Sequence, residues 1–114
     1  MLPPQPAGRF ERRDYFVWEA EQPVKHEYIA GEVFARAGSY QAHVIVAGNI
    51  AAALRQRLRG TPCRAYVSDM QLEVEKADAV CYPDVMVSCH PADLAAERVL
   101  HHPRVIVEVL SDST

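Results

Sequence analysis

The chain has 114 residues, of which 49% are hydrophobic and 24% are charged, and its formal net charge is -3. This length suits one domain, the composition excludes a disordered chain, and the acidic balance means that any contact with DNA needs a local basic patch. No apolar stretch reaches the ~20 residues of a membrane span, and residues 1–10 lack the apolar core of a signal peptide. We therefore expect a cytoplasmic protein without a membrane partner, with a flexible tail at residues 1–8 and one domain at residues 9–114.

The first half of the domain predicts a helix, a hairpin and a second helix. Residues 8–22 form a short amphipathic pattern that ends before a proline, and residues 26–38 predict a β-hairpin that turns at Ala30–Gly31. Residues 39–60 predict the longest helix, with Ser39 as its N-cap and Gly60 at its end. Its buried face recurs at steps of three and four residues and comprises His43, Ala47, Ile50, Ala51, Leu54 and Leu58.

The second half predicts strands around one short helix. Residues 63–76 read as a strand or strand pair, in which the apolar side chains at 70, 72 and 74 alternate with polar ones. Residues 79–89 and 104–110 are continuous apolar runs, each interrupted by one acid, as in strands covered on both faces. Residues 90–103 hold the short helix. The order predicts an α/β fold of the α+β type, with a mixed β-sheet and flanking helices.

Two acids lie inside these apolar runs, Asp84 in "CYPDVMV" and Glu108 in "VIVEVL". A carboxylate in apolar surroundings is disfavoured unless it is paired, protonated or bound to a metal. If the two strands are neighbours, both acids could hold one hard cation such as Mg²⁺, which protein carboxylates share with water and substrate phosphate. In the alternative, Asp84 only starts a strand and Glu108 pairs with a buried arginine. Spacing does not separate these interpretations.

Other polar residues each have a functional and a structural interpretation. Glu27, at the start of the hairpin, is either a third acid of the site or a solvated charge, and His43 is either a base or ligand or a core-edge histidine. The basic run of Arg55, Arg57, Arg59 and Arg64 is either a patch for DNA or a solvated helix end, which commonly carries basic residues.

The three cysteines predict free thiols, because their number is odd and no signal peptide precedes them. A zinc cluster is the alternative for the cysteines and histidines of the second half. Its candidate ligands lack the CxxC or HxxxH spacing of zinc sites and comprise Cys81, Cys89, His90, His101 and His102.

Several stretches together resemble a large bacterial family of restriction-endonuclease-like proteins of unknown biological role, within the PD-(D/E)XK nuclease superfamily. They appear in family order and cover nearly all of the chain after Gly8: "KHEYIAGEVFARAG", "AHVIVAGNIAAALRQRL", "CRAYVSDMQLEV", "YPDVMV" and "PRVIVEVLSDST". The combination of "YPDV" with "VEVLS" is specific, whereas a Pro-Asp pair alone would be weak. The resemblance implies a restriction-endonuclease-like core with acids at the centre of a mixed sheet.

The resemblance also implies roles for individual residues. Asp84 would be the Asp of the PD element and Glu108 the acid of the (D/E)XK element, both coordinating Mg²⁺ or Mn²⁺. Glu27 matches an acid of the family's N-terminal hairpin that would complete the metal shell. His43 matches a histidine at the start of the long helix and would be a substrate-side or network residue.

The chain departs from the family pattern at its end. Val109 and Leu110 follow Glu108 where the motif has X-K, and the later segment in which the family carries its lysine is not in this sequence. We therefore expect a partial domain that lacks the C-terminal part of the core, with an exposed strand edge that a homodimer or higher oligomer covers. The expected function is a metal-dependent DNA endonuclease of weak or lost activity. Lys25 or Lys76 could substitute for the lysine only if the fold brings one of them close to the acids. The alternative is a non-catalytic, oligomeric nucleic-acid-binding or structural remnant.

Overall fold

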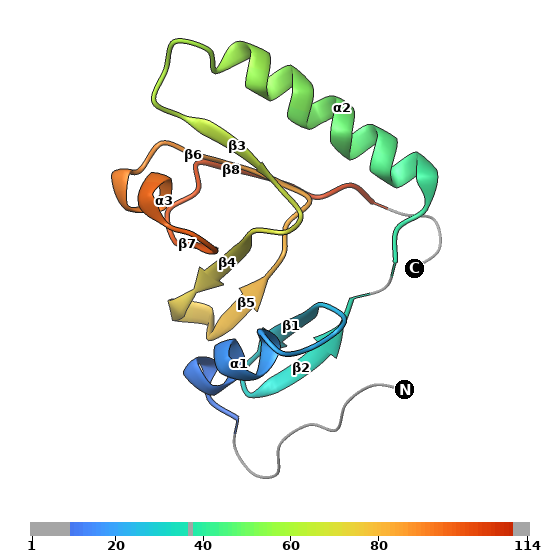
Figure 1. Cartoon of the computed structure of the whole chain (residues 1–114), viewed down its shortest axis with the longest axis vertical. Coiled ribbons are helices and arrows are strands. Elements are labelled where there is room, and N and C mark those ends of the chain that lie inside the picture. The colour runs from blue at the N-terminus through green and yellow to red at the C-terminus, as the bar shows by residue number, and fades with distance from the viewer. Residues whose placement is uncertain (1–9, 37, 111–114) are drawn as a thin grey trace. The chain divides into compact units, whose positions relative to one another are not determined.

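A computed structural model describes residues 10–36 and 38–110, which form two compact units (Figure 1). Unit 1 comprises Met1–Ala37 and Glu73–Cys81, and unit 2 comprises Gly38–Leu72 and Tyr82–Thr114. The predicted flexible tail at residues 1–8 lies outside the described residues. Among the helices of the described ranges, none is long and apolar enough to cross a membrane.

Unit 1 is built on an antiparallel hairpin of β1 (His26–Ile29) and β2 (Glu32–Ala35), and β5 (Ala79–Cys81) pairs antiparallel with β1. The hairpin turns at Ala30 and Gly31, as predicted, and both residues have positive φ angles of 48° and 94°. Positive φ at both central positions matches the right-handed twist of the flanking strands, although this conformation is strained for an alanine.

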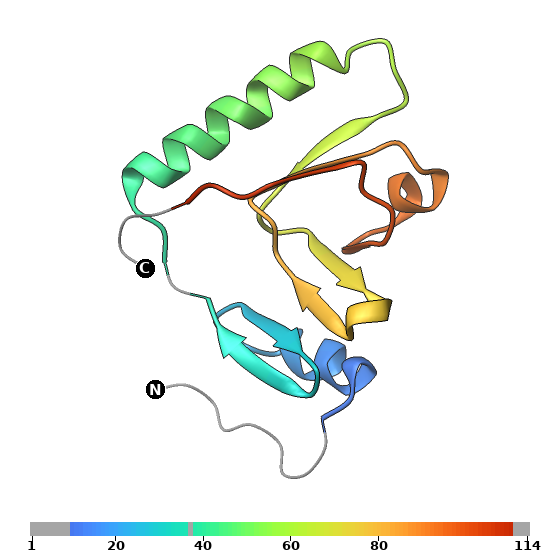
Figure 2. The same ribbon diagram turned by 180° about the vertical axis from the view of Figure 1, so that it is seen from behind.

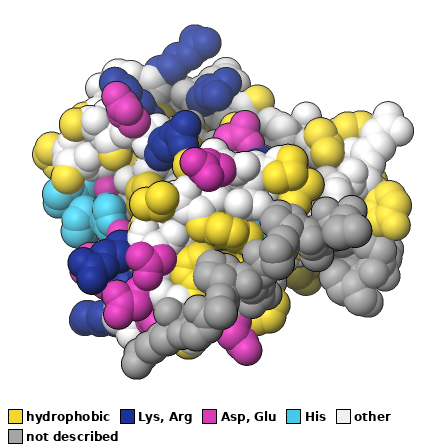
Figure 3. Space-filling view, turned by 60° about the horizontal axis from the view of Figure 1, so that its bottom comes forward, with side chains coloured by type: hydrophobic (Ala, Val, Ile, Leu, Met, Phe, Trp, Pro, Cys, Tyr) yellow, Lys and Arg dark blue, Asp and Glu magenta, His cyan; other side chains and the backbone are white. Residues whose placement is uncertain are grey.

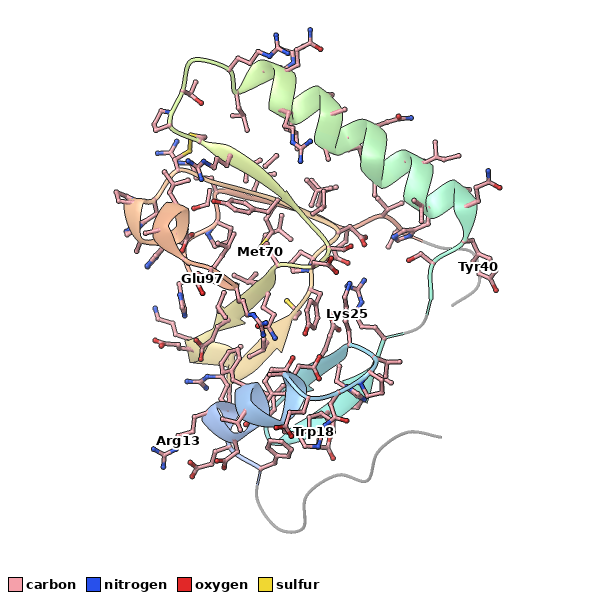
Figure 4. All side chains as sticks on the ribbon, viewed as in Figure 1. Arg13, Trp18, Lys25, Tyr40, Met70 and Glu97 are labelled. Atoms are coloured by element: carbon pink, nitrogen blue, oxygen red, sulfur yellow. A yellow bond between two sulfur atoms is a disulfide. The ribbon has the colours of Figure 1, made fainter. Side chains whose placement is uncertain are left out.

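Helix α1 (Arg12–Glu19) packs against this hairpin and completes an aromatic core. The core contains Phe10, Tyr15, Tyr28, Val33 and Val80, with Phe16 and Trp18 packed against it; Trp18 is labelled in Figure 4. The 3-10 helix η1 (Glu75–Ala77) precedes β5. Arg12 of α1 donates to the carboxylates of Glu73 and Asp78, both at 2.6 Å, and these hydrogen bonds raise the pKa of Arg12, that from Glu73 most.

Unit 2 contains a three-stranded antiparallel sheet in the order β3 (Arg64–Val67), β6 (Val85–Ser88) and β8 (Val105–Val107). Helix α2 (Gln41–Arg57) contacts β3 and β6 and runs beside them in both ribbon views (Figures 1 and 2). Strand β4 (Gln71–Val74) begins in this unit, where Gln71 and Leu72 pair in parallel with β7 (Val99–Leu100), and it passes on into unit 1. Helix α3 (Pro91–Ala95) lies between β6 and β7. Helices with both parallel and antiparallel strand pairs confirm the predicted mixed α+β fold.

The long helix follows its prediction except at its start. It begins at Gln41 after Tyr40, which makes no side-chain cap, so the predicted N-cap at Ser39 is wrong. It ends at Arg57, and Gly60 takes a left-handed conformation just beyond, with a φ angle of 80°. On the predicted inner face Ala51 is buried and its partners are half-buried, whereas Val44, Ile45 and Val46 are exposed.

The two predicted core strands differ in burial. All four residues of β6 are buried, as predicted. Strand β8 is instead the edge of the three-stranded sheet, with Val105 42% and Ile106 50% exposed, so the prediction that it is covered on both faces is wrong. Within the described residues β6 is the only strand that pairs with β8, so the other edge of β8 is unpaired, as the departure from the family pattern predicted.

Candidate active site

The pairing of β6 with β8 brings the two acids of the apolar runs together. Val85 lies opposite Val107, and Met86 lies opposite Ile106. Continued by one step, this antiparallel register places Asp84 opposite Glu108. Directly opposed residues point to the same face of a sheet, so both carboxylates lie on one side of the strand pair.

Reciprocal hydrogen bonds join these two positions beyond the ends of the strands. The backbone N–H of Asp84 donates to Glu108 Oε1 at 3.3 Å, and the backbone N–H of Val109 donates to Asp84 Oδ2 at 2.8 Å. Each carboxylate is therefore held by the backbone of the opposite segment. Asp84 is 5% exposed, whereas Glu108 is exposed to solvent.

Helix α2 adds a histidine to the pair. His43 lies in the first turn of α2, and its Nε2 is 3.0 Å from Asp84 Oδ1. The side chain of His43 is 15% exposed and that of Asp84 5%, so the contact is largely shielded from water. Because α2 packs on β3 and β6, the helix positions the imidazole at the start of β6, next to Asp84.

The donor chemistry of this group fits a divalent cation. Mg²⁺ is commonly held by one or two carboxylates, with water and substrate phosphate in its other positions. Asp84 supplies a buried, fixed carboxylate, and Glu108 supplies an exposed one that water and a phosphate can reach. His43 and the Val109 N–H each engage one oxygen of Asp84, and this is compatible with coordination because the two oxygens of a carboxylate together offer about four acceptor positions.

The remaining predicted site residues lie in unit 1. Glu27 is on β1, opposite Phe34 of β2, and is half-buried. Lys25 precedes β1, and Lys76 is exposed on η1. These are the two lysines of the sequence, so the unit that carries Asp84, Glu108 and His43 contains none.

The predictions for the cysteines are wrong at two of the three positions. Cys63 and Cys89 form a disulfide, shown as a yellow bond near the start of β3 in Figure 4, and their Cα atoms are 4.1 Å apart. They lie one register step beyond the pair Arg64–Ser88, which explains their proximity. Cys81 is a free thiol, as predicted. Because Cys89 is bonded to sulfur, the predicted zinc cluster loses one of its ligands.

Three exposed histidines gather on one face of unit 2 and belong to the cyan patch of Figure 3. The rings of His90 and His102 stack with centroids 4.0 Å apart, and His101 lies beside His102 with centroids 6.3 Å apart. His90 Nδ1 accepts the backbone N–H of Ala92, so this imidazole caps the start of α3. The geometry gives His90 a structural role.

Asp93, a fully buried acid next to these histidines, was not among the residues that the sequence singled out. It accepts hydrogen bonds from Ser88 Oγ at 2.6 Å and from the backbone N–H groups of His101 and His102, both at 2.9 Å. Burial by itself would raise the pKa of Asp93, but these three hydrogen bonds outweigh it and lower the pKa. The sequence carried one signal for Asp93. It follows "HP" in the first turn of the predicted short helix, where acids are favoured.

Comparison with known proteins places these observations in a family. Residues 12–114 match the family Uma2, described as "Putative restriction endonuclease". An uncharacterized protein of Synechocystis sp. (strain ATCC 27184 / PCC 6803 / Kazusa), slr1290, is 30% identical over 112 residues, which are 98% of this chain and 59% of that protein.

A solved structure shares the fold. It comes from Anabaena variabilis ATCC 29413 and is described as "a putative nuclease belonging to DUF820". The TM-score is 0.71 with 18% identity, over 89% of this chain and 59% of that one. The chain thus spans about 59% of the length of both relatives. Since the family match covers nearly the whole sequence, the chain belongs to the Uma2 family of restriction-endonuclease-like proteins.

Proposed function

We propose that this chain acts in the hydrolysis of DNA phosphodiester bonds as a divalent-cation-dependent endonuclease. The observation that carries the proposal is the opposition of the Asp84 and Glu108 carboxylates on neighbouring strands, with His43 3.0 Å from Asp84. These two acids would hold Mg²⁺ or Mn²⁺. When bound, such an ion lowers the pKa of a coordinated water and stabilises negative charge on a phosphodiester.

The surrounding residues would orient the acids. His43 and the backbone N–H of Val109 engage different oxygens of Asp84, which fixes the plane of its carboxylate. Glu27 is proposed as a third acid, which requires unit 1 to bring β1 to the metal. Leu110 stands where the motif has its lysine, and both lysines of the sequence are in unit 1.

Metal binding and cleavage can be tested separately. Mn²⁺ binding is measured by calorimetry, and nicking of supercoiled plasmid is measured with Mg²⁺ or Mn²⁺. Asp84→Asn and Glu108→Gln should each weaken Mn²⁺ binding at least about tenfold and abolish nicking, because each removes one negative oxygen ligand. Glu97→Gln is the matched control, since Glu97 is an exposed acid of the same unit (labelled in Figure 4). Wild-type Mn²⁺ affinity in both site variants would refute the metal site.

The unpaired edge of β8 favours a second candidate, a non-catalytic oligomer that binds nucleic acid. Its oligomeric contact would be the edge of β8, where Val105 and Ile106 are exposed. An unpaired apolar edge strand promotes association with a second chain. This candidate predicts a dimer or larger species by light scattering at micromolar concentration and no nicking with either metal. A monomer under these conditions would exclude it.

A further inference from the structure

A second, basic site lies at the other end of α2. A cavity of about 390 Å³ opens between the end of this helix and the start of β3. Three arginines line it, Arg55 and Arg59 from the helix end and Arg64 from β3, and no acidic residue does. Arg55 is in the last turn of α2, and Arg59 lies in the turn that follows the helix.

Within the part of the chain that the structure describes, none of the three guanidinium groups makes a side-chain hydrogen bond or ion pair. Three positive charges converge on one cavity and repel one another unless an anion is present. A guanidinium offers its N–H groups in a planar fork that matches two oxygens of a phosphate, and this favours a phosphate as the anion.

The negative end of the helix dipole does not oppose an anion strongly here. Thr61 covers the carbonyl of Leu58, which accepts the backbone N–H of Thr61 at 3.1 Å and its hydroxyl at 2.6 Å. The dipole is equivalent to only about half a charge, which three arginines exceed. The Cys63–Cys89 disulfide fixes the chain immediately before Arg64, so one wall of the cavity is covalently anchored.

The cavity and the carboxylate pair are separated by most of the length of α2. Arg55 is twelve positions after His43, which corresponds to about 18 Å along a helix. Successive base pairs rise by about 3.4 Å, so this separation matches roughly five base pairs of a duplex. One DNA molecule lying along α2 could reach both places.

We propose that the cavity lined by Arg55, Arg59 and Arg64 binds a backbone phosphate of nucleic acid, about five base pairs from the phosphate at Asp84 and Glu108. The inference rests on the proposed function for its choice of DNA, and it adds a subsite that holds the duplex away from the reacting bond. Phosphate contacts of this kind position DNA without reading its sequence.

The test is fluorescence anisotropy of a labelled 20-base-pair duplex in EDTA, so that neither metal binding nor cleavage enters. Arg55→Gln and Arg64→Gln should each weaken binding about tenfold, because each loses a charged hydrogen bond to phosphate. Their double variant should reduce the slope of log affinity against log salt by about one. Arg57→Gln is the matched control, since Arg57 is an exposed arginine of the same helix end outside the cavity and should change binding little.

The outcomes separate this subsite from the nuclease proposal. Weaker binding in Arg55→Gln and Arg64→Gln but not in Arg57→Gln supports the subsite even if the wild type never nicks plasmid. Equal effects of all three variants, or no duplex binding by the wild type, would overturn it even if nicking occurs. Competition with inorganic phosphate at constant ionic strength distinguishes a DNA phosphate from free phosphate as the anion. If the cavity binds free phosphate but no duplex, the proposed subsite is also overturned.

Discussion

Replacing Cys63 with serine should destabilise unit 2 by about 3.5 kcal/mol under oxidising conditions. The disulfide joins residues 26 positions apart in sequence, so it closes a loop of that size in the unfolded chain. The loop-closure relation gives an entropy loss of about 12 cal/mol/K for this loop, or about 3.5 kcal/mol at 25 °C. Serine is close to cysteine in size, so the substitution removes the cross-link with little change in packing.

The assay is urea unfolding followed by circular dichroism at 222 nm. Helix α2, with 17 residues, is the longest helix of the described chain and belongs to unit 2, so it dominates this signal. The fluorescence of Trp18, the one tryptophan of the sequence, follows unit 1 in the same samples. Cys81→Ser is the control, because Cys81 is the free thiol.

Chemistry checks the cross-link directly. Without reductant the unfolded wild type should take up one alkylating group, at Cys81, and with reductant it should take up three. Reductant should lower wild-type stability to that of Cys63→Ser and leave the variant unchanged. Three reactive thiols in air-oxidised protein, or equal stability of wild type and variant, would refute the reasoning.

Three further predictions address local features. Asp93→Ala should cost about 3 kcal/mol by urea unfolding, because three buried donors lose a charged acceptor. Hydrogen bonding lowers the folded-state pKa of Asp93, so the carboxylate contributes its full share of the unfolding free energy above the unfolded-state pKa of about 4. This contribution should fade as the pH falls further. If the stability of Asp93→Asn fell equally with decreasing pH, this reasoning would be contradicted. Ala30→Gly should stabilise unit 1 by about 1 kcal/mol in Trp18 fluorescence melts, because glycine adopts positive φ without strain, and a loss of stability would count against the turn. Ile106→Lys should shift any oligomer to monomer in light scattering, and an unchanged mass would exclude the β8 edge as the contact.

Much of the local structure could be predicted from the sequence. The hairpin turn at Ala30–Gly31, the inner face of α2 and the buried strand after Pro83 all follow from patterns within a few residues of one another. The two acids stood out for the same reason, because a carboxylate in an apolar run conflicts with its neighbours. Local patterns of propensity and alternation act along the chain, and they are visible in one sequence.

Features that depend on pairing were harder to predict. The disulfide was missed because odd cysteine counts and wide spacing say nothing about which strands are neighbours. The exposed edge at residues 104–110 was expected from the departure from the family pattern. The apolar run nevertheless predicted coverage on both faces, because such a run does not reveal what packs on a strand, and Val105 and Ile106 are exposed. Asp93 went unnoticed because its three donors come from both sides of α3 and converge only in the folded chain.

The sequence by itself singled out Asp84 and Glu108 as candidate metal ligands, because each is the one acid in a strongly apolar run, and the resemblance added Glu27 as a third. The tertiary structure decided that they meet. The antiparallel register of β6 and β8 places them opposite each other, and α2 brings His43 to the same carboxylate from 41 positions away. A shift of one residue in that register would turn one acid to the other face of the sheet, so the site depends on long-range pairing of the strands.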